Sequence, residues 1–107
     1  MTPEEDGTSH NISMKMYKRR GEVVLAACDR ELLGKKFEEG ELHIHVREEF
    51  YYESFVSEQT FLNSMKLATI INLVGENVVR IAIREGYIDK DNVLRIAGVP
   101  HAQMVLF

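Results

Sequence analysis

The sequence has little cysteine and no long apolar run. Cys28 is the single cysteine among 107 residues, which excludes an internal disulfide bond, whereas small secreted domains usually contain several cysteines. No apolar run approaches the ~20 residues of a membrane-spanning helix, and the N-terminus lacks the basic and then apolar pattern of a signal peptide. We therefore expect a soluble, cytoplasmic protein without a membrane partner.

The motifs of the common nucleotide-dependent enzymes are also missing. The sequence contains no phosphate loop, no glycine-rich dinucleotide fingerprint and no catalytic-serine motif. We therefore expect no cofactor and no catalytic residue of these types.

The net charge of −4 is unevenly distributed along the chain. Glu4, Glu5 and Asp6 lie within the first 11 residues, which contain no Lys or Arg, so residues 12–107 hold 13 basic and 14 acidic side chains. This near balance gives no bulk attraction to nucleic acid or to an anionic membrane. Residues 1–11 are polar and have almost no apolar surface to bury, which predicts a disordered tail before a single domain over residues 12–107.

Apolar patterns predict strands in the first half of this domain. Residues 12–17 alternate between apolar and polar, residues 23–28 form a continuous apolar run, and Arg20-Gly21 between them is a turn signal, so we expect a hairpin. Residues 42–47 alternate again and predict another strand.

Two connections in this half are less regular. Asp29 is suited to cap a single helical turn over residues 30–33, which Gly34 would end. The aromatic-rich segment 50–55 fits either an edge strand or an ordered loop.

The second half is predicted to be mainly helical. Ser57 is a good N-cap, and apolar residues then recur at spacings of three and four up to Glu85, which predicts a shorter and a longer helix that meet near Ala68-Thr69. Gly86 would end the second helix. Residues 92–96 and 102–107 are predicted strands with a turn over residues 97–100. The expected fold is α+β, a mainly antiparallel sheet with two helices packed on one face.

Three segments resemble a known family. They are Cys28–Lys35 (CDRELLGK), Ala68–Glu76 (ATIINLVGE) and Val93–Gln103 (VLRIAGVPHAQ), of which the last is the most specific. Their order and spacing resemble the archaeal family called "domain of unknown function 424" over about residues 14–107. The resemblance implies a small archaeal, cytosolic protein whose family has no assigned biochemical activity. For such compact archaeal proteins we expect an association with translation or RNA handling.

The most site-like segment is the turn Gly98-Val99-Pro100-His101-Ala102-Gln103. Gly98 permits a positive φ, and Pro100 fixes its own φ and restricts the residue before it. His101 and Gln103 are two apart and would share one face of a strand, where an imidazole and an amide could bind a ligand or a partner. The alternative is that both side chains satisfy backbone groups where the turn enters the sheet.

Asn72 and Glu76 are further candidates for ligand or partner binding. On the predicted helix they are four residues apart, face the same way and continue to Arg80, with which Glu76 could pair. Gly75 is costly inside an exposed helix, so we expect another backbone or a ligand close to it, and packing is the simpler explanation.

Five basic residues could contact nucleic acid. Lys18, Arg19 and Arg20 cluster at the tip of the predicted hairpin, and Lys35 and Lys36 would add to them if the fold brought them near. Tyr51 and Tyr52 could stack on bases if they are exposed, but their spacing matches no RNA-binding signature.

Two further constellations have weak support. Cys28 and His101 could form a thiolate–imidazole pair, but Cys28 ends a buried apolar run and precedes Asp29, which disfavours the thiolate. His43 and His45 share a strand face but need further ligands to hold zinc, so we expect no metal.

These observations favour a non-catalytic binding module that acts on RNA, a ribonucleoprotein or another protein complex, with a homodimer also open. The alternative is a small enzyme or small-molecule-binding protein with its site around the Gly98–Gln103 turn.

Overall fold

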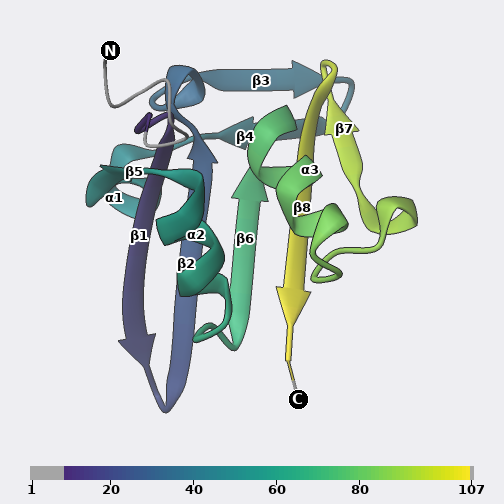
Figure 1. The fold of residues 1–107 in the computed structure, drawn as a ribbon. Helices are drawn as coiled ribbons and strands as arrows, with labels where there is room; N and C mark the ends of the chain where they lie inside the picture. The colour runs from purple at the N-terminus through teal and green to yellow at the C-terminus, as the bar shows by residue number, and fades with distance from the viewer. Residues whose placement is uncertain (1–8, 107) are drawn as a thin grey trace.

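The computed structural model describes residues 9–106 and contains one six-stranded sheet (Figure 1). The strand order is β5-β1-β2-β6-β8-β7, in which only β2 and β6 are parallel and every other neighbouring pair is antiparallel. The strands are β1 (Ile12–Arg19), β2 (Glu22–Asp29), β5 (Ser54–Val56), β6 (Ile70–Val74), β7 (Leu94–Ile96) and β8 (Val99–Val105). The α+β class and the mainly antiparallel sheet predicted from the sequence are confirmed.

A separate two-stranded sheet and three helices complete the fold of residues 9–106. The small sheet pairs β3 (Lys36–Glu39) with β4 (Leu42–His45), and the helices are α1 (Glu48–Tyr51), α2 (Glu58–Met65) and α3 (Glu76–Arg84). Short 3-10 turns cover Arg30–Leu32 and Lys90–Asn92. None of the helices in the described part of the chain is long and apolar enough to cross a membrane.

The predicted first hairpin is present. Its turn places Arg20 at φ 52° and Gly21 at φ 84°, and two successive positive φ angles match the twist of the strands they connect. The prediction of a disordered tail over residues 1–11 falls largely outside the described residues. At the end of that segment, the Asn11 carbonyl accepts a hydrogen bond from the Arg30 amide at 2.9 Å.

The prediction of a long second helix through residue 70 is wrong. Residues 70–74 form β6, a central strand, and the helix α3 begins only at Glu76. The run Ile70-Ile71-Asn72-Leu73-Val74 is rich in β-branched residues, and Ile71, Leu73 and Val74 are completely buried between two layers. A strand that is buried on both faces shows no alternation of apolar and polar residues, so its sequence is also compatible with a helix.

Between residues 30 and 55 the structure also differs from the predicted elements. Residues 36–39 form β3, which the sequence did not indicate, and the aromatic segment divides into α1 and β5. Ser57 caps α2 as predicted, because its side chain accepts a hydrogen bond from the Thr60 amide. The last strand begins at Val99 rather than at Ala102, so the turn shortens to Ala97-Gly98 and Pro100 lies inside β8.

Each face of the large sheet has its own apolar cluster. One face packs against α2 and α3, with Leu25, Ile71 and Leu73 of the sheet beneath Phe61 and Ile81 of the helices. Figure 1 shows both helices in front of the sheet. The other face packs its Ala26, Cys28 and Val74 against Val46 and Tyr51, from the segment that contains α1 and the β3–β4 hairpin. Fully burying an aliphatic side chain contributes about 1.5–3 kcal/mol, so both clusters stabilise the sheet.

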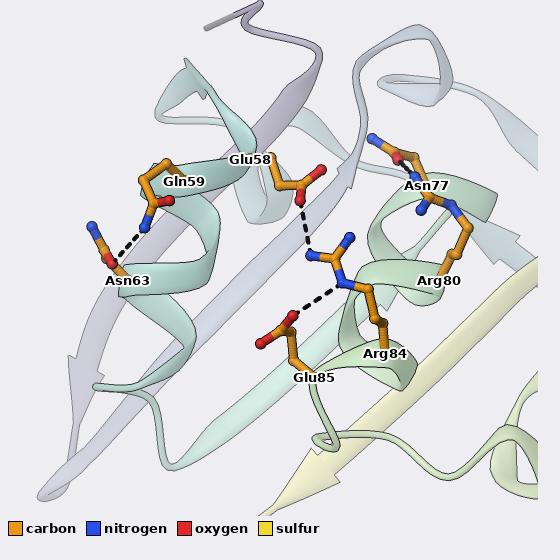
Figure 2. A network of polar contacts seen from close by, with 7 residues as sticks. All are labelled: Glu58, Gln59, Asn63, Asn77, Arg80, Arg84 and Glu85. Carbon is orange, nitrogen blue, oxygen red and sulfur yellow. Dashed lines mark hydrogen bonds and ion pairs between the residues drawn. The ribbon is translucent and has the colours of Figure 1, made fainter. Parts of the chain in front are cut away.

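A polar connection joins the two helices at the surface (Figure 2). The guanidinium of Arg84, at the end of α3, donates to Glu58 at the start of α2 at 2.8 Å and to Glu85 at 3.0 Å. All three side chains are exposed, so salt screens these ion pairs, and they orient the helices rather than hold them on the sheet.

Asp29 and Gly75 fix the start of α3. The Asp29 carboxylate was expected to cap the turn that follows it, but it accepts hydrogen bonds from the backbone amides of Asn77 and Val78 at 2.9 and 3.0 Å. Gly75 has φ 125°, and a Cβ at this position would lie 2.5 Å from Asp29 Cγ. Gly75 is therefore explained by close packing, as predicted, although it precedes the helix rather than lying within it.

We expect Gly75→Ala to lower the free energy of unfolding by about 2 kcal/mol or more, because it adds both a strained φ and a clash with Asp29. Urea unfolding measures the change. Gly86→Ala is the matched control, since Gly86 has φ 84° and nothing within 4 Å of the added Cβ, and it should cost about 1 kcal/mol. Equal losses in the two variants would show that the approach of Asp29 to Gly75 is unimportant.

Candidate functional site

The face of the large sheet away from α2 and α3 is only partly covered. The segment with α1 and the β3–β4 hairpin covers the end of this face that contains Cys28 and Val74. Towards the β1–β2 turn, polar and aromatic side chains remain at least partly accessible. We call the surface formed by these side chains the open sheet face; it consists of Lys15, Tyr17 and Arg19 of β1, Asn72 of β6, and His101 and Gln103 of β8.

Asn72 lies at the centre of a hydrogen-bond network on this face. Its Oδ1 accepts a hydrogen bond from the Tyr51 hydroxyl at 2.6 Å, and His101 Nε2 lies 3.3 Å from the same oxygen. Gln103 is directly opposite Asn72 in the β6–β8 ladder, so the two amide side chains are neighbours. With Oδ1 engaged by Tyr51, the Asn72 amide hydrogens remain to donate to a ligand.

Burial determines the charge of His101. The imidazole is half-buried next to an amide rather than a carboxylate, and desolvation lowers the pKa of His101 below its usual 6.5. A neutral imidazole has one donor and one acceptor nitrogen. Because Asn72 Oδ1 can only accept, Nε2 is the donor in that contact, and Nδ1 remains as an acceptor for a partner.

Tyr51 reaches the network from α1, which covers the neighbouring part of the same sheet face. Tyr51 is buried, with its ring edge-on to Phe50 at 4.9 Å, and its backbone carbonyl accepts a hydrogen bond from Ser13 Oγ at 2.8 Å. These contacts hold the Tyr51 hydroxyl in place against Asn72, so a buried residue of α1 fixes the orientation of the Asn72 amide.

Cys28 is part of the covered layer and is separated from His101. The two residues lie on the same row of the sheet with Val74 between them, which places them two strand spacings, about 10 Å, apart. Cys28 is completely buried, and burial together with the neighbouring Asp29 raises the pKa of its thiol to about 12. The proposed thiolate–imidazole pair is therefore not formed.

The remaining predicted residues of the C-terminal site lie elsewhere. Pro100 is completely buried and its carbonyl accepts from the Gly75 amide, so it supports the sheet rather than a ligand. Glu76 does not pair with Arg80: its carboxylate binds the Arg95 guanidinium at 2.9 Å, which also lowers the pKa of Glu76. Arg95 donates in addition to the Gly98 carbonyl at 3.1 Å. Glu76 and the Gly98 turn therefore belong to a different surface from Asn72, His101 and Gln103.

That second surface is a groove of about 740 Å³ beside α3. Its apolar floor includes Val79 and Ile83, and Glu76, Arg80 and Arg95 line its rim. Because three acidic and three basic side chains line it and Glu76 is already paired with Arg95, the groove offers no concentrated charge for a ligand.

The five basic residues do not form one cluster. Lys18, Arg19 and Arg20 lie at the β1–β2 turn, whereas Lys35 and Lys36 follow the opposite end of β2 (Figure 1). An eight-residue strand separates them by about 25 Å. The fold does not bring Lys35 and Lys36 near the hairpin tip, and only the first group lies next to the open sheet face.

His43 and His45 lie on the small β3–β4 sheet, opposite Glu38 and Lys36 respectively. Across residues 9–106 no group of three or more His, Cys, Asp or Glu side chains is arranged to hold a metal ion.

Lys15 and Tyr17 were not among the site residues predicted from the sequence, and Tyr51 was predicted only as a candidate for base stacking. The alternation of residues 12–17 already placed Lys15 and Tyr17 on the polar face of a strand, which was an available signal. The role of Tyr51 depends on a contact between residues 21 positions apart, which no local pattern reveals.

We expect the free energy of unfolding to decrease as the pH is lowered through the titration range of His101. Because the pKa of His101 is lower in the folded than in the unfolded chain, the unfolded chain binds the proton more readily. The stability is therefore complete above about pH 6.5 and decreases as the pH falls towards the folded pKa. Urea unfolding at a series of pH values should show a smaller loss below pH 6.5 in His101→Gln than in the wild-type protein. Parallel pH curves for the two proteins would contradict this assignment.

Comparisons with known proteins agree with the resemblance of the three sequence segments. Among curated proteins none is significantly similar to this chain in sequence. A crystal structure described as that of an uncharacterized conserved protein from Methanopyrus kandleri is similar in fold, with a TM-score of 0.77 and 25% sequence identity, covering 90% of this chain and 91% of that one. The family model described as "Protein of unknown function (DUF424)" matches residues 17–107. This chain therefore belongs to the family "Protein of unknown function (DUF424)".

Proposed function

We propose that the protein is a non-catalytic recognition module that binds single-stranded RNA on the open sheet face. The observation that carries this proposal is the gathering of basic, aromatic and amide side chains from β1, β6 and β8 on one partly uncovered surface of a sheet whose other face is packed against helices. Sheets with this combination provide both a backbone contact and a base contact for unpaired nucleotides.

Each type of side chain on this surface has a complementary group in RNA. Arg19 at the β1–β2 turn, with Lys18 and Arg20 beside it, offers positive charge to phosphates. Tyr17 offers a ring beside the Lys15 ammonium, which lies 5.6 Å from the ring centroid, and one face of a base could stack there. The amides of Asn72 and Gln103 can donate to and accept from base edges.

The alternative, a small enzyme or small-molecule-binding protein at the Gly98–Gln103 turn, has less support. The candidate residues for that site divide between two surfaces. Glu76 lines the α3 groove and Gly98 is hydrogen-bonded to Arg95 of that groove, whereas His101 and Gln103 lie on the open sheet face. The Cys28 thiol is buried and its pKa of about 12 keeps it protonated at neutral pH. A surface that presents hydrogen-bonding groups without an activated nucleophile favours recognition over covalent catalysis.

We also infer a cytoplasmic protein that acts with RNA or a ribonucleoprotein, for example in translation. The single buried, reduced cysteine suits the cytoplasm, where thiols remain free. RNA binding is the property that this assignment requires first.

We expect Lys18→Gln/Arg19→Gln to weaken binding to a random-sequence single-stranded RNA, because two charges beside the open sheet face are lost. In fluorescence anisotropy, the slope of log affinity against log salt should decrease by roughly 1.4, at about 0.7 for each phosphate contact with a single strand.

The matched control is Lys35→Gln/Lys36→Gln, which removes the same charge at the opposite end of β2. It should leave both affinity and salt slope close to those of the wild-type protein. If the two double variants weaken binding equally, RNA does not bind on the open sheet face, and if the wild-type protein binds no RNA at low salt, the proposed function is wrong.

A further inference from the structure

The outer edge of β8 is only half paired. Leu106 donates its amide to the Thr69 carbonyl, and the Pro100 carbonyl accepts from Gly75, so the even-numbered residues of β8 direct their backbone groups towards β6. The odd-numbered residues face the other way, where β7 pairs with Val99 and His101 only. The backbone N–H and C=O groups of Gln103 and Val105 therefore have no partner within residues 9–106.

This free edge is also apolar and uncharged. Leu94, Val105 and Leu106 lie along it with 46%, 51% and 59% of their surface exposed, which is half of the large hydrophobic side chains that are exposed in the described chain. No charged residue occurs from Val99 to Leu106. The outer edge of β1 is different: beyond its pairing with β5 it carries Lys15, Lys18 and Arg19, the charged side chains that usually prevent strands from adding to an edge.

We propose that a second copy of this chain pairs with the free edge of β8 and forms an antiparallel dimer. In the symmetric register Gln103 lies opposite Val105 of the second copy, and Met104 lies on the two-fold axis. The two pairs of odd-numbered residues exchange their free N–H and C=O groups, which gives four hydrogen bonds between the copies. The backbone groups that are unpaired in one chain are thus satisfied by the same groups in the other.

A second copy of the chain is the partner that fits this edge best, because the unpaired backbone groups and uncharged side chains of the edge can pair with the same groups in another copy. An uncharged strand brings no like charges together when it meets its own copy, whereas directly opposed like charges would destabilise the pair. In this register the pairing extends as far as the free part of the edge. Leu106 of the second copy lies opposite Ala102, and the next residue of β8, His101, is already paired with Leu94 of β7. The exposed Leu94, Val105 and Leu106 would then lie within or beside the new contact.

The pairing has a consequence for the surface of the protein. Two sheets joined edge to edge by a two-fold axis perpendicular to them form one continuous sheet, so both open sheet faces lie on the same side. The dimer does not depend on RNA binding, and its test is independent of that function.

Sedimentation equilibrium from micromolar to millimolar concentration should show a monomer–dimer equilibrium for the wild-type protein. Gln103→Lys/Val105→Lys places like charges opposite each other in both pairs and should give a monomer throughout. Gln103→Lys/Val105→Glu carries the same number of substitutions, places opposite charges in both pairs, and should dimerise. A wild-type protein that stays monomeric, or a dimer that survives the double lysine variant, overturns the proposal.

A cross-link tests the register even if a charged variant folds poorly. Met104→Cys places two thiols on the two-fold axis, in a pair whose Cα atoms are about 4.5 Å apart, within the range that a disulfide bond spans. Mild oxidation should give a covalent dimer on a non-reducing gel. Tyr52→Cys, at a residue that is 39% exposed and lies beside β5 at the opposite edge of the six-stranded sheet, is the control and should remain mainly monomeric. Equal cross-linking of the two variants would contradict the register.

Discussion

The buried carboxylate of Asp29 connects the two halves of the fold. It lies at the end of β2 and accepts hydrogen bonds from two amides in the first turn of α3, 48 and 49 residues further along the chain. Burial raises the pKa of Asp29, and the two hydrogen bonds from α3 oppose that shift. Such a cap contributes about 1–2 kcal/mol to a helix, and it can form here only because Gly75 has no side chain at the point of closest approach.

The position of α3 determines which surface is left for recognition. Because Asp29 and Gly75 turn the chain after β6 towards the face already covered by α2, the opposite face receives only the short α1 and the β3–β4 hairpin. Asn72, on the opposite face of β6, therefore contacts Tyr51 of α1 and His101 of β8. The face that packs against α2 and α3 stabilises the strands, and the open sheet face presents their polar side chains.

The sequence predicted the class of the fold and the first hairpin because their signals are local. Alternation in residues 12–17 and the Arg20-Gly21 turn depend only on neighbouring residues. The strand β6 was missed because burial on both faces removes its period, and that error placed Asn72 and Glu76 on one helix face when they lie on opposite sides of the sheet. His101 and Gln103 were correctly placed on one strand face, but their meeting with Asn72, and the use of Asp29 as a cap for α3, depend on pairings between distant segments.

The most direct test of this account is an NMR titration of the ¹⁵N-labelled protein with short single-stranded RNA of random sequence. We predict that the side-chain amide signals of Asn72 and Gln103 shift, together with backbone signals of β1 and β8, while the signals of α2 and of the α3 groove change little. Shifts concentrated at Glu76, Arg80 and Arg95, or no shifts at low salt, would contradict the assignment of recognition to the open sheet face.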